Sequence, residues 1–162
     1  MVQKHEKTCC FAGHREIADR DVENSIKKIA EDLIVTQNVK TFLVGHYGRF
    51  DACCHSVIQK LKKVYQDISL DLVIPYLTNE INEYKELYYQ NYDRILIADM
   101  PLNTPRKFQI IQANFYMIDS SDYLICYINR SFGGATQTYR YAKRKNLTIF
   151  NIAELVKNIN TA

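Results

Sequence analysis

Residues 8–16 read TCCFAGHRE, a short apolar run that passes through one glycine into polar and charged residues. The run Thr8–Phe11 has the length of a buried strand and ends where the glycine begins a loop. Beyond the loop, the segment from about Asp21 to Thr36 repeats apolar residues at helical spacing, at Val22, Ile26, Ile29, Ala30 and Leu33. We therefore predict a strand, a glycine loop and a helix in this order.

The same alternation continues to the end of the chain. Further strands are predicted at Thr41–Val44, Leu70–Ile74, Ile95–Ala98, Tyr123–Ile128 and Thr148–Asn151. Helices are predicted at about Phe50–Tyr65, Asn79–Tyr92 (irregular and rich in tyrosine), Arg106–Asp119, Ala135–Lys145 and from Ala153 onward. Strands that alternate with helices through short connections favour a parallel sheet covered on both faces. The prediction is one α/β domain over residues 1–162, doubly wound, with a mostly parallel sheet of about six strands.

Composition excludes several classes of protein. The chain has 162 residues, of which 47% are hydrophobic and 24% charged, as expected of a globular protein with a sizeable core. The formal net charge of +3 is a small excess, so we do not expect a nucleic-acid or membrane surface. No apolar run approaches the roughly 18 residues of a membrane span, and the polar start MVQKHEKT does not resemble a signal peptide.

The cysteine content points to a reducing compartment. The five cysteines are odd in number and include two adjacent pairs, at Cys9, Cys10, Cys53, Cys54 and Cys126. Neighbouring side chains on a strand point to opposite faces, so the first pair cannot easily share a metal ion. We expect buried structural thiols, a cytoplasmic location and no metal site.

All five glycines lie in loops that directly follow predicted strands, at Gly13, Gly45, Gly48, Gly133 and Gly134. In a parallel sheet these loops emerge at one edge, and each leads into a helix N-terminus, where backbone N–H groups favour an anion. Ligands of open α/β sheets sit at this edge. The ordinary alternative is that tight strand-to-helix turns use glycine in any case. Because three loops hold all the glycines, we favour a phosphate or nucleotide cleft.

Polar and aromatic residues beside the glycines suit such a cleft, although each has a structural alternative. His14 and Arg15 can hold a phosphate or carboxylate, or form a surface pair with Glu16 or Asp19. Asp51 can accept a ribose hydroxyl or cap the second predicted helix. The remaining candidates are hydroxyl donors that can also be helix caps (Ser131, Thr136 and Thr138) and aromatic rings that can stack on a base or belong to the core (Tyr47 and Phe50).

Four stretches together resemble the SLOG superfamily, most closely its small YpsA-like bacterial members. They are TCCFAGHRE at 8–16, GHYGRFDACCHSVIQKLK at 45–62, LVIPYL at 72–77 and ANFYMIDSSDYLICYINRSFGGATQTYRYAKRKNLTIFNI at 113–152. The resemblance implies a Rossmann-like fold that binds nucleotides or nucleotide-derived ligands. Relatives include the Lonely Guy phosphoribohydrolases, DNA-processing proteins and sensors of NAD-derived signals. By position, the implied ligand-binding residues are Gly13, His14, Arg15, Gly45, Tyr47, Gly48, Phe50, Asp51, Asn114, Gly133, Gly134, Ala135, Thr136 and Thr138.

The chain departs from its relatives at three places. The phosphoribohydrolases carry a catalytic glutamate in P-G-G-x-G-T-x-x-E, whereas residues 132–140 read FGGATQTYR and contain no carboxylate. YpsA-like members typically carry R-N-R where this chain has Ala113-Asn114-Phe115, and His46 stands where a second glycine is common. These differences weigh against transferring any particular activity.

The main prediction is therefore a module, non-catalytic or a sensor, that binds an NAD- or ADP-ribose-like ligand or a nucleoside monophosphate. The alternative is a nucleoside 5′-monophosphate N-glycosidase, with Asp51 as the candidate catalytic residue. A second alternative is single-stranded nucleic-acid binding. It rests on the cations Arg140, Lys143, Arg144 and Lys145 near Tyr139 and Tyr141, but we do not expect nucleic acid as a partner.

No cofactor is expected to be required, although a bound nucleotide could bring Mg²⁺. The tyrosine-rich segment with Tyr84, Tyr88, Tyr89 and Tyr92 either packs on the sheet edge or forms the interface of a homodimer. We expect the homodimer, because SLOG relatives commonly form dimers.

Overall fold

The structure is a computed structural model that describes residues 5–18 and 20–155. Its strands are β1 Lys7–Gly13, β2 Val39–Val44, β3 Ser69–Ile74, β4 Arg94–Ile97, β5 Tyr123–Tyr127 and β6 Thr148–Asn151. Its helices are α1 Val22–Gln37, α2 Arg49–Val64, α3 Asn79–Glu83, α4 Lys85–Asn91, α5 Arg106–Asp119 and α6 Gly134–Arg144. Residues 152–155 are also helical, and the rest of the predicted C-terminal helix lies outside the described residues.

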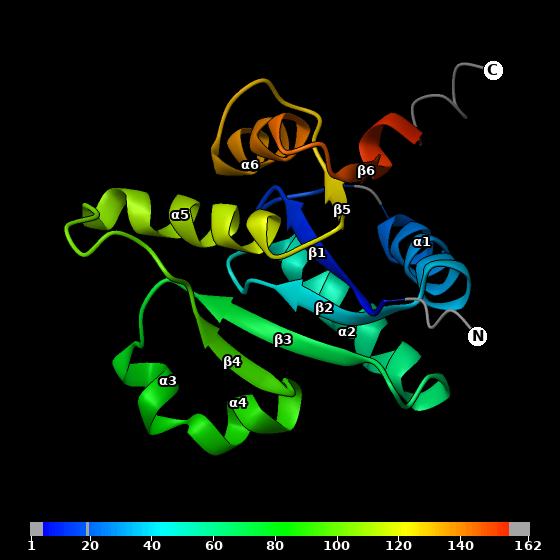
Figure 1. The fold of residues 1–162 in the computed structure, drawn as a ribbon, viewed down its shortest axis with the longest axis horizontal. Helices are drawn as coiled ribbons and strands as arrows, with labels where there is room; N and C mark the ends of the chain where they lie inside the picture. The colour runs from blue at the N-terminus through cyan, green and yellow to red at the C-terminus, as the bar shows by residue number, and fades with distance from the viewer. Residues whose placement is uncertain (1–4, 19, 156–162) are drawn as a thin grey trace.

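The strands form one six-stranded sheet with the order β4-β3-β2-β1-β5-β6, and all neighbouring strands in it run parallel (Figure 1). The chain starts in the middle at β1, builds outward to β4, and then crosses to the other side of β1 for β5 and β6. The predicted Rossmann-like α/β fold is thus confirmed. The direction of building reverses between β1 and β5, which is the place where sheets of this kind bind ligands.

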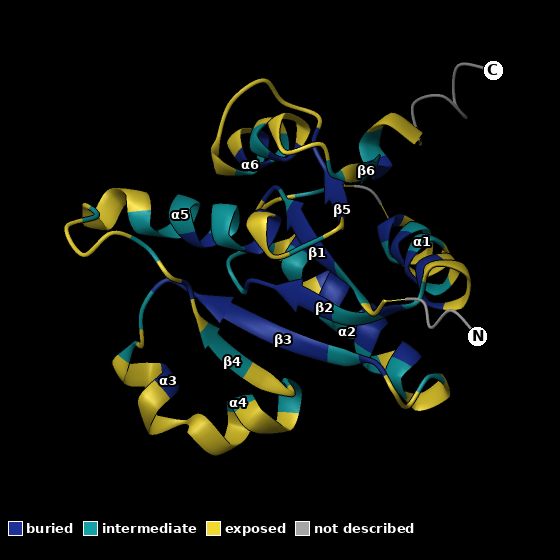
Figure 2. Ribbon diagram, in the orientation of Figure 1, coloured by how far each residue is buried: buried dark blue, intermediate teal, exposed yellow. Residues whose placement is uncertain are grey.

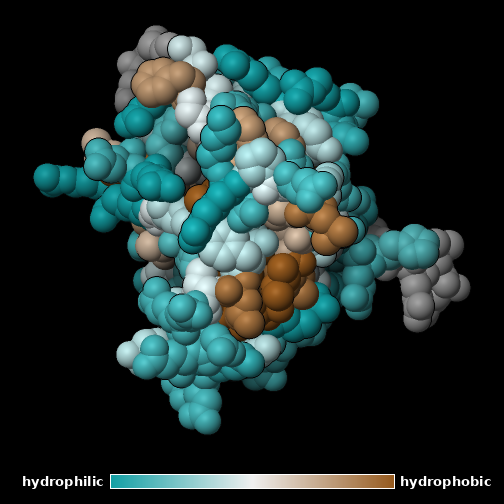
Figure 3. All heavy atoms as spheres, turned by 90° about the vertical axis from the view of Figure 1, so that its left-hand side faces the viewer, coloured by the Kyte–Doolittle hydropathy of each residue, from teal (hydrophilic) through white to brown (hydrophobic). Residues whose placement is uncertain are grey.

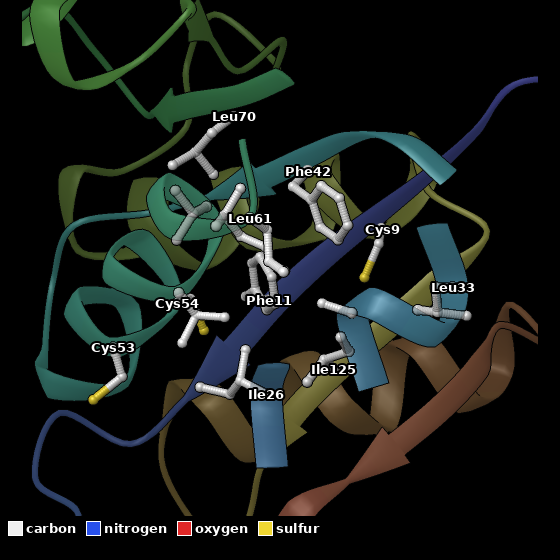
Figure 4. Close-up of a cluster of buried hydrophobic side chains, with 14 of the residues drawn as sticks. Cys9, Phe11, Ile26, Leu33, Phe42, Cys53, Cys54, Leu61, Leu70 and Ile125 are labelled. Atoms are coloured by element: carbon white, nitrogen blue, oxygen red, sulfur yellow. The ribbon is translucent and has the colours of Figure 1, made fainter. Parts of the chain in front are cut away.

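Two layers of apolar side chains pack the sheet against helices on both faces. Alternate residues of β1 point to opposite sides, so Cys9 belongs to the cluster under α1 and α2, and Cys10 to the cluster under α5 and α6. Figure 4 shows the first cluster, in which Phe11 and Phe42 lie stacked with ring centroids 5.9 Å apart. All five cysteines are buried free thiols, and burial raises the pKa of each.

The segment predicted as one irregular helix, Asn79–Tyr92, is instead two short helices, α3 and α4. Thr78 caps the first, since its hydroxyl oxygen accepts a hydrogen bond from the Ile81 N–H at 3.1 Å. Tyr84, with φ −107° and ψ 32°, ends this helix and starts the next. Ile81 is buried against β3, whereas α4 contains no buried residue, so these two helices are largely exposed (Figure 2).

Candidate functional site

A cleft of about 290 Å³ lies at the carboxyl ends of β1, β2 and β5, where the order of building reverses. It is lined by Phe11, Ala12, Gly13, His14, Arg15, Tyr47, Gly48, Asp51, Ile110, Asn114, Arg130, Phe132, Gly133, Gly134 and Ala135. The predicted meeting of three glycine loops is therefore observed, with Gly13, Gly48 and Gly134 around one cavity. Figure 3 shows the side of the molecule toward which β3 points: hydrophilic residues dominate it, with smaller hydrophobic areas between them.

The first loop places a neutral histidine beside two arginines. His14 is buried, and its Nε2 accepts a hydrogen bond from the Asn129 N–H at 3.2 Å, which ties the β1 loop to the loop after β5. Burial lowers the pKa of His14, and the nearby positive charge of Arg130 lowers it further. With Nε2 as an acceptor, the proton of the neutral imidazole is on Nδ1. Arg15 and Arg130 are exposed and line the cleft.

The second loop packs directly against the first. A Cβ atom on Gly48 would lie 2.5 Å from Cα of Arg15, so only glycine allows this approach. The Arg49 N–H donates to the Arg15 carbonyl at 2.8 Å, and the Tyr47 N–H donates to Asp51 Oδ2 at 3.1 Å. Asp51 therefore holds the loop that precedes α2; the capping alternative considered from the sequence is not observed, because the start of α2 has no side-chain cap hydrogen bond.

Asp51 is also the carboxylate that faces the cleft. Burial raises its pKa from the ordinary 3.8 to about 6, although the hydrogen bond from Tyr47 and the charge of Arg15 both act in the opposite direction. A carboxyl group with this pKa in a cleft is a general candidate for a functional role. Among the described residues that line the cleft, no other carries a carboxylate.

The third loop adopts a conformation that requires glycine. Gly133 has φ 99° and ψ 170°, in a region that other residues rarely occupy, and no atom lies within 4 Å of where its Cβ would be. This residue is the N-cap of α6, and Gly48 is the N-cap of α2; neither helix start has a side-chain cap hydrogen bond. The starts of α2 and α6 therefore both lie at the cleft, where the positive ends of the two helix dipoles favour an anion.

Several predicted ligand residues serve the fold instead. Phe50 is fully buried, and its ring packs beneath Gly13, where an added Cβ would meet it at 2.3 Å, so it cannot stack on a ligand. Thr136 and Thr138 are buried; the first hydroxyl donates to the carbonyls of Arg130 and Phe132 and the second to that of Gly134, at 2.8–3.0 Å.

Gly45 and Ser131 are also absent from the cleft lining. Gly45 is buried, and a Cβ on it would lie 3.1 Å from Asp51 Oδ2. Ser131 is exposed, and its carbonyl accepts a hydrogen bond from Arg140 at 3.0 Å. Asp19, considered as a partner of His14 or Arg15, lies outside the described residues.

Sequence reasoning missed Arg130 and Phe132. Both lie in the loop between β5 and α6, and both are exposed at the cleft. The sequence could have indicated them, because they stand in the same strand-end loop as the neighbouring glycines. A residue in such a loop is placed at the edge of the sheet where ligands bind. That the cleft residues bind a ligand stays a prediction.

Neither a membrane span nor a metal cluster is found in the part of the chain that the structure describes. No helix there is both long and apolar enough to cross a bilayer. No three His, Cys, Asp or Glu side chains of the described residues gather in a group that could hold a metal ion.

Comparison with known proteins gives matches in structure alone. No family model and no curated protein matches the chain. DNA processing protein A (DprA) from Streptococcus pneumoniae is similar with a TM-score of 0.64 and 16% sequence identity, over 90% of this chain and 50% of that chain. DNA processing protein A from Helicobacter pylori, solved in a study of its single-stranded DNA binding mode, gives a TM-score of 0.62 and 15% identity, over 90% and 64%.

The likeness shows the fold, and this chain spans about half to two thirds of the proteins that it matches. It also corrects one sequence-based expectation, that nucleic acid is not a partner. That expectation is wrong, because a protein with this fold binds single-stranded DNA. The physical reason is that a net charge of +3 averages over the whole surface, whereas phosphate binding depends on the few cations and N–H groups at one place.

Proposed function

We propose that this chain is a SLOG-type protein whose strand-end cleft binds the sugar-phosphate backbone of single-stranded nucleic acid. The observation that carries the proposal is the meeting of two uncapped helix N-termini with Arg15 and Arg130 around one cleft. Backbone N–H groups and guanidinium groups are the donors that hold phosphate in proteins. The DNA processing proteins of the same fold, one of them studied for its binding of single-stranded DNA, support this choice of ligand.

A second candidate is a nucleotide or a nucleotide-derived molecule in the same cleft. The volume of about 290 Å³ supports it, because it is close to the lower end of the range for small-molecule pockets. Turnover of such a ligand is less well supported. Hydrolysis of an N-glycosidic bond requires one group to stabilise the transition state and another to activate water, and Asp51, already bonded to the Tyr47 N–H, is the only carboxylate among the described lining residues.

The test measures binding of a fluorescein-labelled oligothymidine by anisotropy between about 50 and 200 mM salt. We expect binding that weakens with salt, and Arg130→Ala should both weaken it and reduce the magnitude of the logarithmic salt slope by about 0.7, the value for one phosphate contact on a single strand. AMP and ADP-ribose are added as competitors. Displacement by either at low concentration would favour the second candidate.

The matched control is Arg144→Ala, which removes the same charge from the far end of α6. Arg144 belongs to the basic cluster singled out in the sequence, and its guanidinium carbon lies 5.7 Å from the ring centre of Tyr141. Binding that is lost in Arg144→Ala but retained in Arg130→Ala and Arg15→Ala would move the site from the cleft to this cluster. Absence of oligothymidine binding at physiological salt would refute the proposal.

A further inference from the structure

A second cavity, of about 440 Å³, lies between the β2–α2 loop, α2 and the helices α3 and α4. Its lining includes His46, His55, Glu80, Tyr84 and Tyr88. None of its lining residues is a lysine or an arginine. The cavity therefore differs in chemistry from the cleft: it offers aromatic faces and polar edges but no cation for a phosphate.

The rings of this cavity form a connected series. His46 and Tyr88 have ring centroids 6.3 Å apart, Tyr88 and Tyr92 are stacked at 6.5 Å, and Tyr92 and His55 lie at 4.9 Å. The His55 ring is also held by a polar contact, with Nε2 3.1 Å from the Asn91 carbonyl oxygen. Several aromatic rings thus line one concavity, and Tyr88 and Tyr92 also pack against the buried cluster that contains Ile81.

One loop joins this cavity to the cleft. His46 lines the cavity, and the next residue, Tyr47, lines the cleft, with the two rings edge to face at 4.6 Å. The Tyr47 N–H is fixed by Asp51 at the start of α2, so the position of this boundary is set by the same contact that organises the cleft. The cleft and the cavity therefore adjoin at this pair of neighbouring side chains.

The charges around the cavity favour a neutral planar group. Burial lowers the pKa of His46, although the nearby Glu80 carboxylate acts in the opposite direction, so the imidazole offers one donor and one acceptor at neutral pH. Glu80 itself repels phosphate. Aromatic faces with hydrogen-bonding groups at their edges are surroundings in which proteins stack and bind a nucleobase of a single strand.

Exposure of the outer residues argues against a role in packing alone. Tyr84 is 52% exposed and Leu87 55% exposed, yet both line the cavity. We propose that this cavity, which we call the aromatic pocket, stacks a nucleobase of the single strand whose phosphate occupies the cleft. The inference rests on the proposed function and extends it from backbone binding to base binding.

The experiment compares two labelled oligonucleotides of equal length, oligothymidine and an abasic strand that keeps the sugar-phosphate backbone. Stacking on an aromatic side chain is lost in the abasic strand, so the native protein should bind it about 5- to 100-fold more weakly. Tyr84→Ala should weaken oligothymidine binding and leave abasic binding unchanged, whereas Tyr84→Phe should bind both strands as the native protein does.

The matched control is Tyr89→Ala. Tyr89 is 57% exposed on the same helix segment but does not line the aromatic pocket, so its loss should change neither affinity. Circular dichroism and light scattering of each variant accompany the titrations. Both proposals fail if neither strand binds, whereas equal binding of the two strands by the native protein refutes base stacking alone. A change in oligomeric state in Tyr84→Ala, with oligothymidine affinity unchanged, would also refute it and would identify this surface as an interface between copies of the chain.

Discussion

Replacement of Asp51 by asparagine should stabilise the protein at neutral pH, although it alters a residue that organises the cleft. The carboxylate is desolvated at the start of α2, and its pKa of about 6 compares with an ordinary value of 3.8. At 1.36 kcal/mol for each pKa unit, this difference corresponds to at most about 3 kcal/mol of cost for the ionised form. Asparagine keeps an oxygen that can accept the Tyr47 N–H, so the loop retains its hydrogen bond.

The sign of the pH dependence follows from proton binding. Because the native state holds the Asp51 proton more tightly than the unfolded state, this contribution to stability is fully present below about pH 4 and is lost as the pH rises through about 6. We therefore expect the difference in free energy of unfolding between Asp51→Asn and the native protein to grow over this window. It should reach about 1–3 kcal/mol in favour of the variant by pH 7.5.

Urea unfolding followed by circular dichroism, from pH 4 to pH 8, measures this difference directly. Other carboxyl groups titrate in both proteins, and their contributions cancel in the comparison. The same variant should bind oligothymidine at least as tightly as the native protein at pH 7.5, because a negative charge has been removed beside the phosphate site. A variant that is less stable than the native protein at pH 7.5, or a difference that does not change with pH, would refute the reasoning.

Three further predictions concern stability, each measured by urea unfolding at pH 7.5. Asn151→Ala should lower the free energy of unfolding by about 2–4 kcal/mol. The buried amide accepts a hydrogen bond from the Ile128 N–H and donates one to the Ile128 carbonyl, both at 3.0 Å, and both backbone groups would lose their partner. Gly133→Ala should cost about 1–3 kcal/mol, since its φ of 99° strains any side chain, and should also weaken oligothymidine binding. Arg94→Met should lower the free energy of unfolding by about 1–3 kcal/mol, because it leaves the fully buried Asp71 carboxylate without its ion pair at 2.7 Å, although the Arg94 side chain is itself exposed.

Each of these variants has a control. Gly134→Ala should be tolerated, because this neighbour has no positive φ and an added Cβ would meet nothing closer than Ile111 at 4.0 Å. Equal loss in both glycine variants would contradict the argument from φ. Asp71→Leu combined with Arg94→Met should recover most of the loss of the single variant, and a double variant that is no more stable would show that the buried charge is not the cause. If Asn151→Ala lowers the free energy of unfolding by less than about 1 kcal/mol, water replaces the hydrogen bonds of the amide and the reasoning is wrong.

Much of the local structure could be predicted from the sequence. The bounds of α5 and β6 are as predicted, and the other strands differ by a few residues at their ends. The break at Tyr84 was not predicted; it separates α3, which buries Ile81 against β3, from α4, which contains no buried residue. The position of the cleft loops followed from the glycines, although Gly13 is the last residue of β1 and Gly134 the first residue of α6, and not loop residues as predicted.

The sequence by itself determined the alternation of strands and helices, the parallel sheet and the gathering of the glycine loops at one edge, because these depend on local periodicity and on the direction of each strand. Only the tertiary structure decided that Phe50 lies beneath Gly13, that Thr136 and Thr138 bond their own loop and helix, and that Arg130 faces the cleft. It also decided that His46 opens onto a second cavity. The physical reason is that the orientation of a side chain depends on which distant residues fill the space around it, and this is fixed by the packing of β1 between β2 and β5.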